Sequence, residues 1–186
     1  MIYFSSDSHY FHRNIITYTN RPFKDIEHMN EALIQNWNSV VKPEDEIWVL
    51  GDFSFGKPDK TAEIVKRLNG YKRLVLGNHD KKSHLWGFDE VITGNTSTKI
   101  GDTSVLLSHY PYPPRPEENS DQYDVRYLDR RYEDRGAWLL HGHSHGNNGK
   151  MKRKMIDVGV DCWNYTPISI DFIQELMAKY PEGFKE

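Results

Sequence analysis

Five short polar clusters in this chain carry imidazole, carboxylate and amide groups. They are Asp7-Ser8-His9, Gly51-Asp52, Gly77-Asn78-His79-Asp80, Ser108-His109 and Gly142-His143-Ser144-His145. Nitrogen and oxygen groups of this kind bind divalent transition metals, and the clusters hold more of them than one tetrahedral ion needs. Two ions that share one carboxylate would account for these groups better than a single ion. With nine histidines and one cysteine in the chain, histidine and oxygen ligands are expected rather than thiolates.

Each polar cluster follows a short apolar run that reads as a β-strand. Strands are predicted at 2–4, 46–50 and 74–76. A helix capped by Asp25 and ending before Pro43 separates the first two, and a helix at 60–68 separates the second pair. This alternation predicts a largely parallel α/β sheet with helices packed against it. Because ligands collect outside the carboxyl ends of parallel strands, the clusters are expected to converge on one place.

The pattern changes after the third cluster. Strands are predicted at 88–92, 96–100 and 103–107, and the short turns between them favour antiparallel neighbours. Further strands are expected at 138–141 and 155–160, followed by a closing helix at 170–179. The proline-rich and then highly charged stretch at about 111–136 is interpreted as a surface excursion that would suit a lid. The 186 residues are expected to form one domain, 1–186.

The order of the clusters resembles that of the calcineurin-like metallophosphoesterases, in a small bacterial or phage-type branch. The motifs of that family run D-x-H, GD, GNH with D or E, a lone H, and GHxH, and all five stand here in order, beginning at Asp7 and ending at His145. The resemblance spans nearly the whole chain, to about Asp161. It implies an α/β fold in which two mixed β-sheets pack as a sandwich flanked by helices.

The resemblance also implies a role for each motif residue. One metal would be held by Asp7, His9, Asp52 and His145, and the other by Asn78, His109, His143 and the bridging Asp52. His79 would be the general acid for the leaving oxygen, with Asp80 orienting or polarising its ring. Manganese is the expected metal, with iron, zinc, nickel or magnesium as alternatives, because mixed nitrogen and oxygen sites do not fix metal identity.

Charge at such a centre is consistent with phosphate-ester hydrolysis. Two divalent ions bring four positive charges, while Asp7 and Asp52 return two negative charges and a bridging hydroxide one more. The surplus would attract a phosphate ester and stabilise the charge that develops in the transition state. The hydroxide would attack phosphorus in line, so no protein nucleophile is required. A phosphodiester or nucleotide-like substrate is expected, because the chain has little length left for a capping domain.

Residues near the motifs are candidates for substrate contact. His12 and Arg13 follow the first motif, while Tyr110 and Arg115 follow His109 and could offer a stacking face and a charge. Other groups are expected to be structural or solvated: His28, His84, His141, Asp157, Asp161 and the basic run of Lys150, Lys152, Arg153 and Lys154.

Composition narrows the function classes further. The formal net charge of −3 gives no global basic field, so a nuclease acting on nucleic acid is an alternative that is not favoured over a phosphate-ester small molecule or nucleotide. A scaffold that uses the fold for protein contacts is a second alternative. Cys162 is the single cysteine and cannot form an internal disulfide, and no transmembrane or signal-peptide pattern is visible. A cytoplasmic protein without membrane contact is therefore expected, and the oligomeric state is left open.

Overall fold

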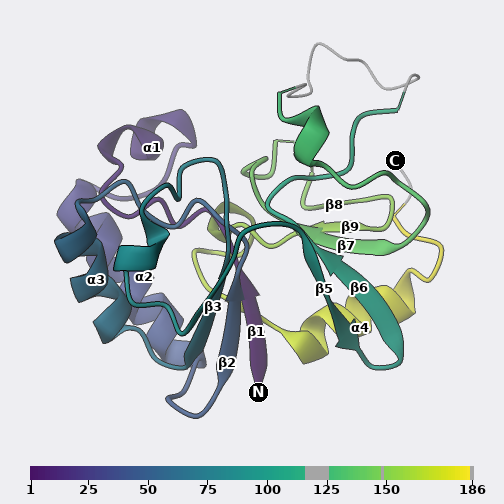
Figure 1. The fold of residues 1–186 in the computed structure, drawn as a ribbon, viewed down its shortest axis with the longest axis horizontal. Helices are drawn as coiled ribbons and strands as arrows, with labels where there is room; N and C mark the ends of the chain where they lie inside the picture. Colours follow the sequence, from purple (N-terminus) through teal and green to yellow (C-terminus); the bar gives the residue numbers. More distant parts are fainter. Residues whose placement is uncertain (116–125, 148, 185–186) are drawn as a thin grey trace.

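Two five-stranded sheets form the framework of the computed structural model (Figure 1). The structure describes residues 1–115, 126–147 and 149–184. The sheets pack through a shared apolar cluster to which both contribute, including Phe4 and Leu50 from the first half of the chain and Val105, Leu107 and Leu140 from the second. The predicted α/β fold with two packed mixed sheets and flanking helices is confirmed.

The first sheet has the strand order β10-β1-β2-β3-β4. Its parallel strands are β1 (Ile2–Ser5), β2 (Glu46–Val49), β3 (Tyr71–Val75) and β4 (Glu90–Ile92), and β10 (Ile168–Ser169) is antiparallel to β1. The helices between them are α1 (Arg13–Tyr18), α2 (Ile26–Val40) and α3 (Pro58–Arg67). The predicted N-cap holds, since the Asp25 carboxylate accepts a hydrogen bond from the His28 amide at 2.7 Å.

The second sheet has the strand order β5-β6-β7-β9-β8. Its strands are β5 (Thr96–Ile100), β6 (Thr103–Leu107), β7 (Trp138–His141), β8 (Met151–Lys152) and β9 (Met155–Asp157). The β5–β6 hairpin is antiparallel as predicted. The strand predicted at 88–92 is not its antiparallel neighbour. It forms β4, which pairs in parallel with β3, and the turn after it carries the chain from one sheet to the other.

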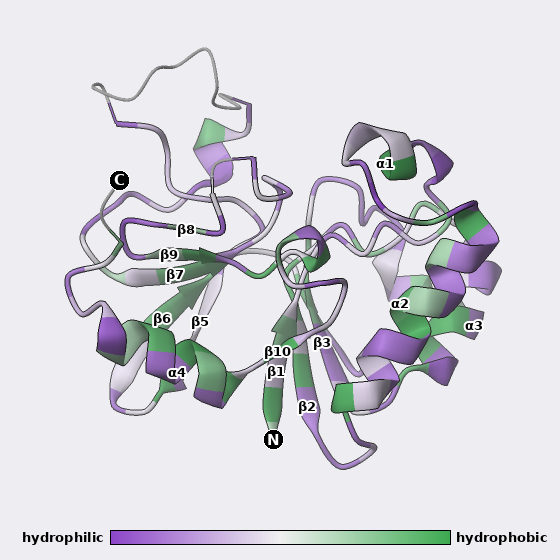
Figure 2. Cartoon of the chain, turned by 180° about the vertical axis from the view of Figure 1, so that it is seen from behind, coloured by the Kyte–Doolittle hydropathy of each residue, from purple (hydrophilic) through white to green (hydrophobic). Residues whose placement is uncertain are grey.

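Apolar side chains account for the layers. Helices α2 and α3 cover one face of the first sheet, where Leu33, Trp37 and Ile64 pack with the strand residues Ile47 and Leu74. Helix α4 (Ile170–Lys179) adds Ile173 and Met177 to the cluster between the sheets. Figure 2 shows the resulting pattern, in which α2, α3 and α4 carry polar residues beside apolar ones. Among the described residues, no helix is both long and apolar enough to cross a membrane.

The predicted surface excursion at about 111–136 is only partly superficial. Tyr112 is buried against Leu139 and Met155 and so covers the second sheet. On the far side of the excursion, a short 3-10 helix, η3 (Leu128–Arg130), returns toward β7. Positions 116–125, which include much of the charged stretch expected to form a lid, lie outside the described residues.

Candidate metal centre

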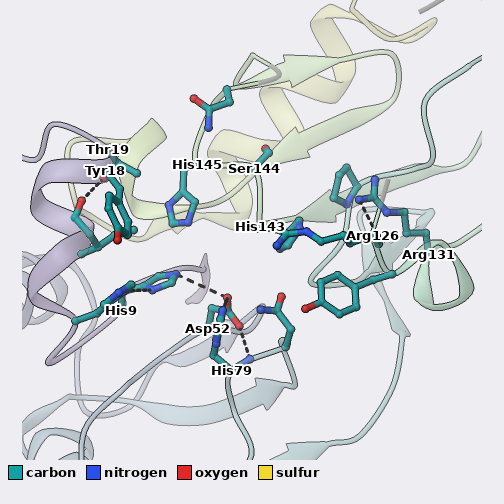
Figure 3. Close-up of a pocket in the computed structure, with 16 residues that line it drawn as sticks. His9, Tyr18, Thr19, Asp52, His79, Arg126, Arg131, His143, Ser144 and His145 are labelled. Atoms are coloured by element: carbon teal, nitrogen blue, oxygen red, sulfur yellow. Dashed lines mark hydrogen bonds and ion pairs between the residues drawn. The ribbon is translucent and has the colours of Figure 1, made fainter. Parts of the chain in front are cut away.

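All five polar clusters lie at the carboxyl ends of parallel strands and meet between the two sheets. They follow β1, β2 and β3 in the first sheet and β6 and β7 in the second. Residues of four of the clusters line one cleft of about 490 Å³, into which Figure 3 looks. The convergence that strand order predicts is therefore present in the structure.

The ligand atoms form two groups, each drawn from both sheets. Asp7, His9 and His145 make the first group, and Asp52, His109 and His143 make the second, with the ligand atoms of each group within 4.8 Å of one another. His9 Nε2 and His145 Nε2 lie 3.7 and 3.8 Å from Asp7 Oδ1. Such spacing leaves room for one cation among the atoms of each group, at ordinary ligand distances.

Asp52 and Asn78 complete this arrangement. Asp52 Oδ2 lies 3.5 Å from His109 Nε2 and 3.8 Å from His9 Nε2, so the carboxylate sits between the groups. Asn78 Oδ1 is 3.2 Å from His109 Nε2, which places it beside the second group. The structure thus brings together all seven residues expected to bind metal.

Two buried atoms in the first group lack a hydrogen-bond partner among the described residues. They are Asp7 Oδ1 and His9 Nε2. Burial raises the pKa of Asp7, but His9, His145 and His109 together hold that pKa well below its usual value, so the carboxylate is ionised. A buried carboxylate oxygen without a partner is costly, and a cation would satisfy it. The residues therefore fit a divalent metal.

The backbone is strained at several of the clusters, where it turns sharply and directs side chains toward the centre. Asp7, His9, Asp52, His143 and His145 have φ angles between 48° and 69°. Residues with side chains seldom adopt this left-handed region, and strained backbone of this kind clusters at functional sites. The turn at the end of each strand aims side chains from neighbouring loops at the same point.

Glycine allows the loops of the two sheets to touch. A Cβ atom at Gly142 would lie 2.0 Å from Ser6 Oγ and 2.2 Å from Asp7 Oδ2. The amide of the next residue, His143, instead donates to Asp7 Oδ2 at 2.8 Å. The glycine of the last motif is thus required by the approach of the β7 loop to the β1 loop.

A buried ion pair supports the first group from behind. The Asp161 carboxylate lies 2.8 Å from His145 Nδ1 and accepts two hydrogen bonds, each of 2.8 Å, from Arg21. The same guanidinium donates to the carbonyl oxygens of Asp7 and Ser8 at 2.8 and 2.9 Å. Asp161 follows β9 and Arg21 follows α1, so neither belongs to a sequence motif. The ion pair with Arg21 agrees with the structural role expected for Asp161, and the carboxylate also contacts a candidate ligand directly.

Asp157 holds the last motif in shape. It is fully buried, and its carboxylate accepts hydrogen bonds from the Ser144 hydroxyl at 2.6 Å, from the Gly146 amide at 3.1 Å and from the Gly159 amide at 2.8 Å. These bonds fix the loop that presents His143 and His145. A structural role, which the sequence analysis predicted, agrees with these contacts.

Asp80 has partners other than the one expected. Its carboxylate accepts hydrogen bonds from the backbone amides of Asp52, Phe53 and Gly77, at 2.8, 3.0 and 2.8 Å. Burial and the nearby Asp52 carboxylate raise the pKa of Asp80 to about 6, although the amides of Gly77 and Phe53 oppose the shift. Asp80 therefore clamps the β2 loop to the β3 loop. The expectation that it orients the ring of His79 is not matched by these contacts.

His79 lies at the open side of the centre. Its side chain is 44% exposed and Nε2 lies 3.9 Å from Asp52 Oδ2, while its amide donates to Asp52 Oδ1 at 3.0 Å. The ring stands 4.5 Å from that of Phe55, between centroids. An exposed imidazole beside the ligand groups can reach a bound ester, as a general acid must.

Only one of the four expected substrate contacts lines the cleft. His12 does so, with Nδ1 3.1 Å from His9 Nδ1, and burial lowers its pKa to about 4, so the ring is neutral near pH 7. Arg13 is exposed on α1 and is not a lining residue. Tyr110 is buried behind the centre, against His109 and His143, because the chain turns inward after β6.

Arg115 and the basic run after the last motif lie elsewhere. Arg115 pairs with Asp134 in a separate hollow, to which Arg153 and Lys154 also belong. Arg153 is buried and pairs with the same carboxylate at 2.8 Å. The run therefore shapes the β8–β9 hairpin and does not border the cleft.

Sequence reasoning missed several side chains that border the cleft. Tyr18 and Thr19 come from the end of α1, and Arg126 and Arg131 come from the excursion on the opposite side (Figure 3). Tyr127, also from the excursion, lines the cleft as well. None stands in a motif or at a regular spacing, so no signal in the chain marked them. Three positions do, however, lie within the stretch at 111–136 that was expected to border the site.

Comparisons with known proteins agree with the geometry. The family model described as a calcineurin-like phosphoesterase superfamily domain matches residues 1–160. An uncharacterized protein of Methanocaldococcus jannaschii is 35% identical in an alignment that covers 96% of this chain and 92% of that protein. The Gene 66 protein of Mycobacterium phage L5 is 31% identical, covering 94% of this chain and 93% of its own.

A solved structure shares the fold. It is a protein of unknown function from Aquifex aeolicus, with a TM-score of 0.73 and 32% identity. The match covers 95% of this chain and 98% of that one. Both the sequence relatives and this structure therefore extend over nearly the same length as the chain described here.

Proposed function

Since the chain belongs to the calcineurin-like phosphoesterase superfamily, we propose that it is a metal-dependent phosphoesterase that hydrolyses a phosphodiester or nucleotide-like substrate at this cleft. The observation that carries the proposal is the pair of three-residue ligand groups, with the Asp52 carboxylate lying between them. Two divalent ions, when bound, supply Lewis-acid activation of water and polarisation of the phosphoryl oxygens. Manganese remains the expected metal. The mixed nitrogen and oxygen ligands suit iron or zinc equally well.

The residues of the chain have separate roles in the proposed reaction. Asp7, His9, Asp52, Asn78, His109, His143 and His145 would hold the ions, with Arg21 and Asp161 behind them. His79 gives a proton to the leaving oxygen as the bond from phosphorus to that oxygen breaks. The attacking water gives its oxygen to phosphorus and releases one proton to solvent, so a phosphodiester yields an alcohol and a phosphate monoester. Arg126 and Arg131, on the opposite side of the cleft, add positive charge where an anionic ester would enter.

The test is hydrolysis of bis-p-nitrophenyl phosphate and p-nitrophenyl phosphate by metal-free and manganese-loaded protein. We expect activity only after loading, and we expect Asp52→Asn to reduce it at least about 100-fold because it weakens both ligand groups. The matched control is Asp102→Asn, at an exposed carboxylate in the β5–β6 turn. Equal inactivity of loaded and metal-free protein on both esters would overturn the proposal and favour the scaffold alternative.

The nuclease alternative has its own signature. A nucleic-acid substrate needs a continuous basic surface, and its binding weakens steeply with salt. The basic run at Lys150, Lys152, Arg153 and Lys154 does not line the cleft, which supports the small-ester reading. A cytoplasmic location, in keeping with the single buried Cys162, stays a prediction.

A further inference from the structure

Two histidines face each other, nitrogen to nitrogen, beside the first ligand group. His9 Nδ1 lies 3.1 Å from His12 Nδ1, the ring centroids are 5.3 Å apart and the ring planes differ by 28°. That centroid separation is close to the largest that the nitrogen contact allows, so the rings meet edge to edge and the two Nδ1 atoms point at each other. One ring must donate and the other accept, because two lone pairs, or two N–H groups, would repel.

The metal position decides which ring of the pair donates. His9 Nε2 is buried without a hydrogen-bond partner among the described residues, 3.7 Å from Asp7 Oδ1 and 3.8 Å from Asp52 Oδ2. A neutral histidine that binds a cation through Nε2 uses the lone pair of that nitrogen, so its proton is on Nδ1. His9 then donates its Nδ1–H to His12, and the proton of the His12 ring is on Nε2.

The histidines at positions 109 and 145, which also direct Nε2 at a ligand group, have partners that impose the same tautomer. His145 Nδ1 lies 2.8 Å from the Asp161 carboxylate, and His109 Nδ1 lies 2.8 Å from the Leu50 carbonyl oxygen. An ionised carboxylate and a carbonyl can only accept, so each fixes the proton of its histidine on Nδ1. The partner of His9 differs, since a neutral imidazole accepts only when its own proton is on the other nitrogen.

A third ring covers the pair of histidines. The Phe55 ring is nearly parallel to both imidazoles, at 19° in each case, with its centroid 5.1 Å from that of His9 and 4.1 Å from that of His12. His9 is only 3% exposed. Phe55 therefore shields one face of the contact from water, where a hydrogen bond is stronger than in bulk solvent. The stacking also holds the His12 ring in the orientation that faces His9.

We propose that His12 is a positioning residue for the first metal: its Nδ1 accepts the proton of His9 Nδ1 and so keeps the lone pair of His9 Nε2 directed at the ligand group before any ion binds. The proposal rests on the metal-dependent function proposed above. It differs from the substrate contact that the sequence suggested for His12. It also requires the tautomers to be set in the metal-free protein, which separates it from an effect of the ion itself.

Nitrogen NMR of the metal-free protein at neutral pH tests the tautomers directly. With isotopically labelled histidine rings, protonated and unprotonated ring nitrogens give separate signals. We expect the proton on Nδ1 in His9 and on Nε2 in His12. Spectra of His9→Gln and His12→Asn identify the two rings by the signals that disappear. A proton on Nε2 of His9 in the metal-free protein would overturn the proposal, whatever any substituted protein does.

Metal affinity tests the role of the His12 acceptor. Metal content of the manganese-loaded protein is measured after dialysis against graded chelator. We expect His12→Leu to weaken one of the two ions about 10- to 100-fold. His12→Asn, whose Oδ1 can accept the same hydrogen bond, should stay within about threefold of wild type. The matched control is His84→Leu, at an exposed histidine in the 3-10 helix η1 (Ser83–Leu85).

The outcomes separate this role from packing and from the proposed function. Equal losses in His12→Leu and His12→Asn would show that the ring only fills space, and no loss in His12→Leu would remove the role altogether; either result overturns the proposal. If the tautomers and affinities are as expected but the loaded protein hydrolyses no ester, the proposed function fails while the positioning role stands. Metal-dependent hydrolysis with both ions retained in His12→Leu would give the opposite conclusion.

Discussion

The carboxylate of Asp161 lies 2.8 Å from Nδ1 of His145, on the side of the ring turned away from Asp7. A hydrogen bond there places the imidazole proton on Nδ1 and leaves the lone pair of Nε2 facing the first ligand group. Burial lowers the pKa of His145, but Asp161 and Asp7 outweigh that effect and raise it overall, which increases the basicity of the ring. Carboxylates behind histidine ligands commonly orient and strengthen them in this way.

Replacing Asp161 by asparagine should weaken the first metal position. We expect the affinity for one of the two ions to fall about 10- to 100-fold while the other is retained. Metal content after dialysis against graded chelator, measured by elemental analysis, reports both ions without any assay of activity. Asp102→Asn, at an exposed carboxylate, is the control. Equal loss of both ions, or of neither, would contradict the role given to Asp161.

Substituting alanine for Gly142 should disrupt the meeting of the two sheets. The added Cβ would lie 2.0 Å from Ser6 Oγ and 2.2 Å from Asp7 Oδ2, both in a buried region that has little room to move. Overpacking of this kind costs about 1 to 3 kcal/mol of unfolding free energy. Urea unfolding of the metal-free protein measures this cost, and Gly94→Ala, where no atom lies within 4 Å of the new Cβ, should show almost none. A Gly142 variant as stable as wild type would show that the loops do not approach this closely.

Asp80→Ala should lower the free energy of unfolding, because Asp80 holds two loops together and has no direct part in the reaction. The substitution leaves the amides of Asp52, Phe53 and Gly77 without the acceptor that now serves all three. An unsatisfied buried amide costs about 1 to 3 kcal/mol, so a loss of at least about 2 kcal/mol in unfolding free energy is expected. Thermal and urea unfolding with Asp102→Asn as reference give the value. If stability were unchanged while turnover fell, Asp80 would act on the reaction itself, as the sequence analysis expected.

His79→Ala should separate substrates by their leaving groups. Without a proton donor, an alkyl phosphodiester should lose about 100- to 10,000-fold in kcat/KM, whereas p-nitrophenyl esters, whose leaving group needs little protonation, should lose far less. The control is His84→Ala, an exposed histidine in the short helix that follows the third motif. A uniform loss across leaving groups would assign His79 to substrate binding instead of proton transfer.

The motifs predicted the centre for two reasons. Their residue types are those of metal ligands, and their positions after apolar strands place them at one edge of the sheets. Asp7, Asp52 and His143 could be located from sequence, since parallel strands deliver their carboxyl ends to one edge. The partners of Asp80 could not be foreseen, because they are backbone amides of another loop and no side chain in the sequence signals them. Tyr110 is buried, although its neighbours suggested a binding loop, because tertiary packing decides which way a side chain turns after its strand.

The burial of Arg21 is a second feature that the sequence does not predict. Its side chain is fully buried and bonded to two backbone carbonyls and one carboxylate. An arginine in a polar loop is expected at the surface, and only the fold reveals that this side chain is buried against Met29 and Asp161. The pairing of β4 with β3 belongs to the same class of features, since the length of the turn after β4 favoured a hairpin and the sheets placed it otherwise.

Each ligand group takes residues from both halves of the chain, and this sets when the centre can come into existence. Asp7 and His9 are synthesised early, while His145 is synthesised only after most of the chain. During synthesis neither group can be complete until β7 has left the ribosome and docked beside β6. Under the proposed function, complete metal coordination would therefore become possible only after most of the chain has been synthesised.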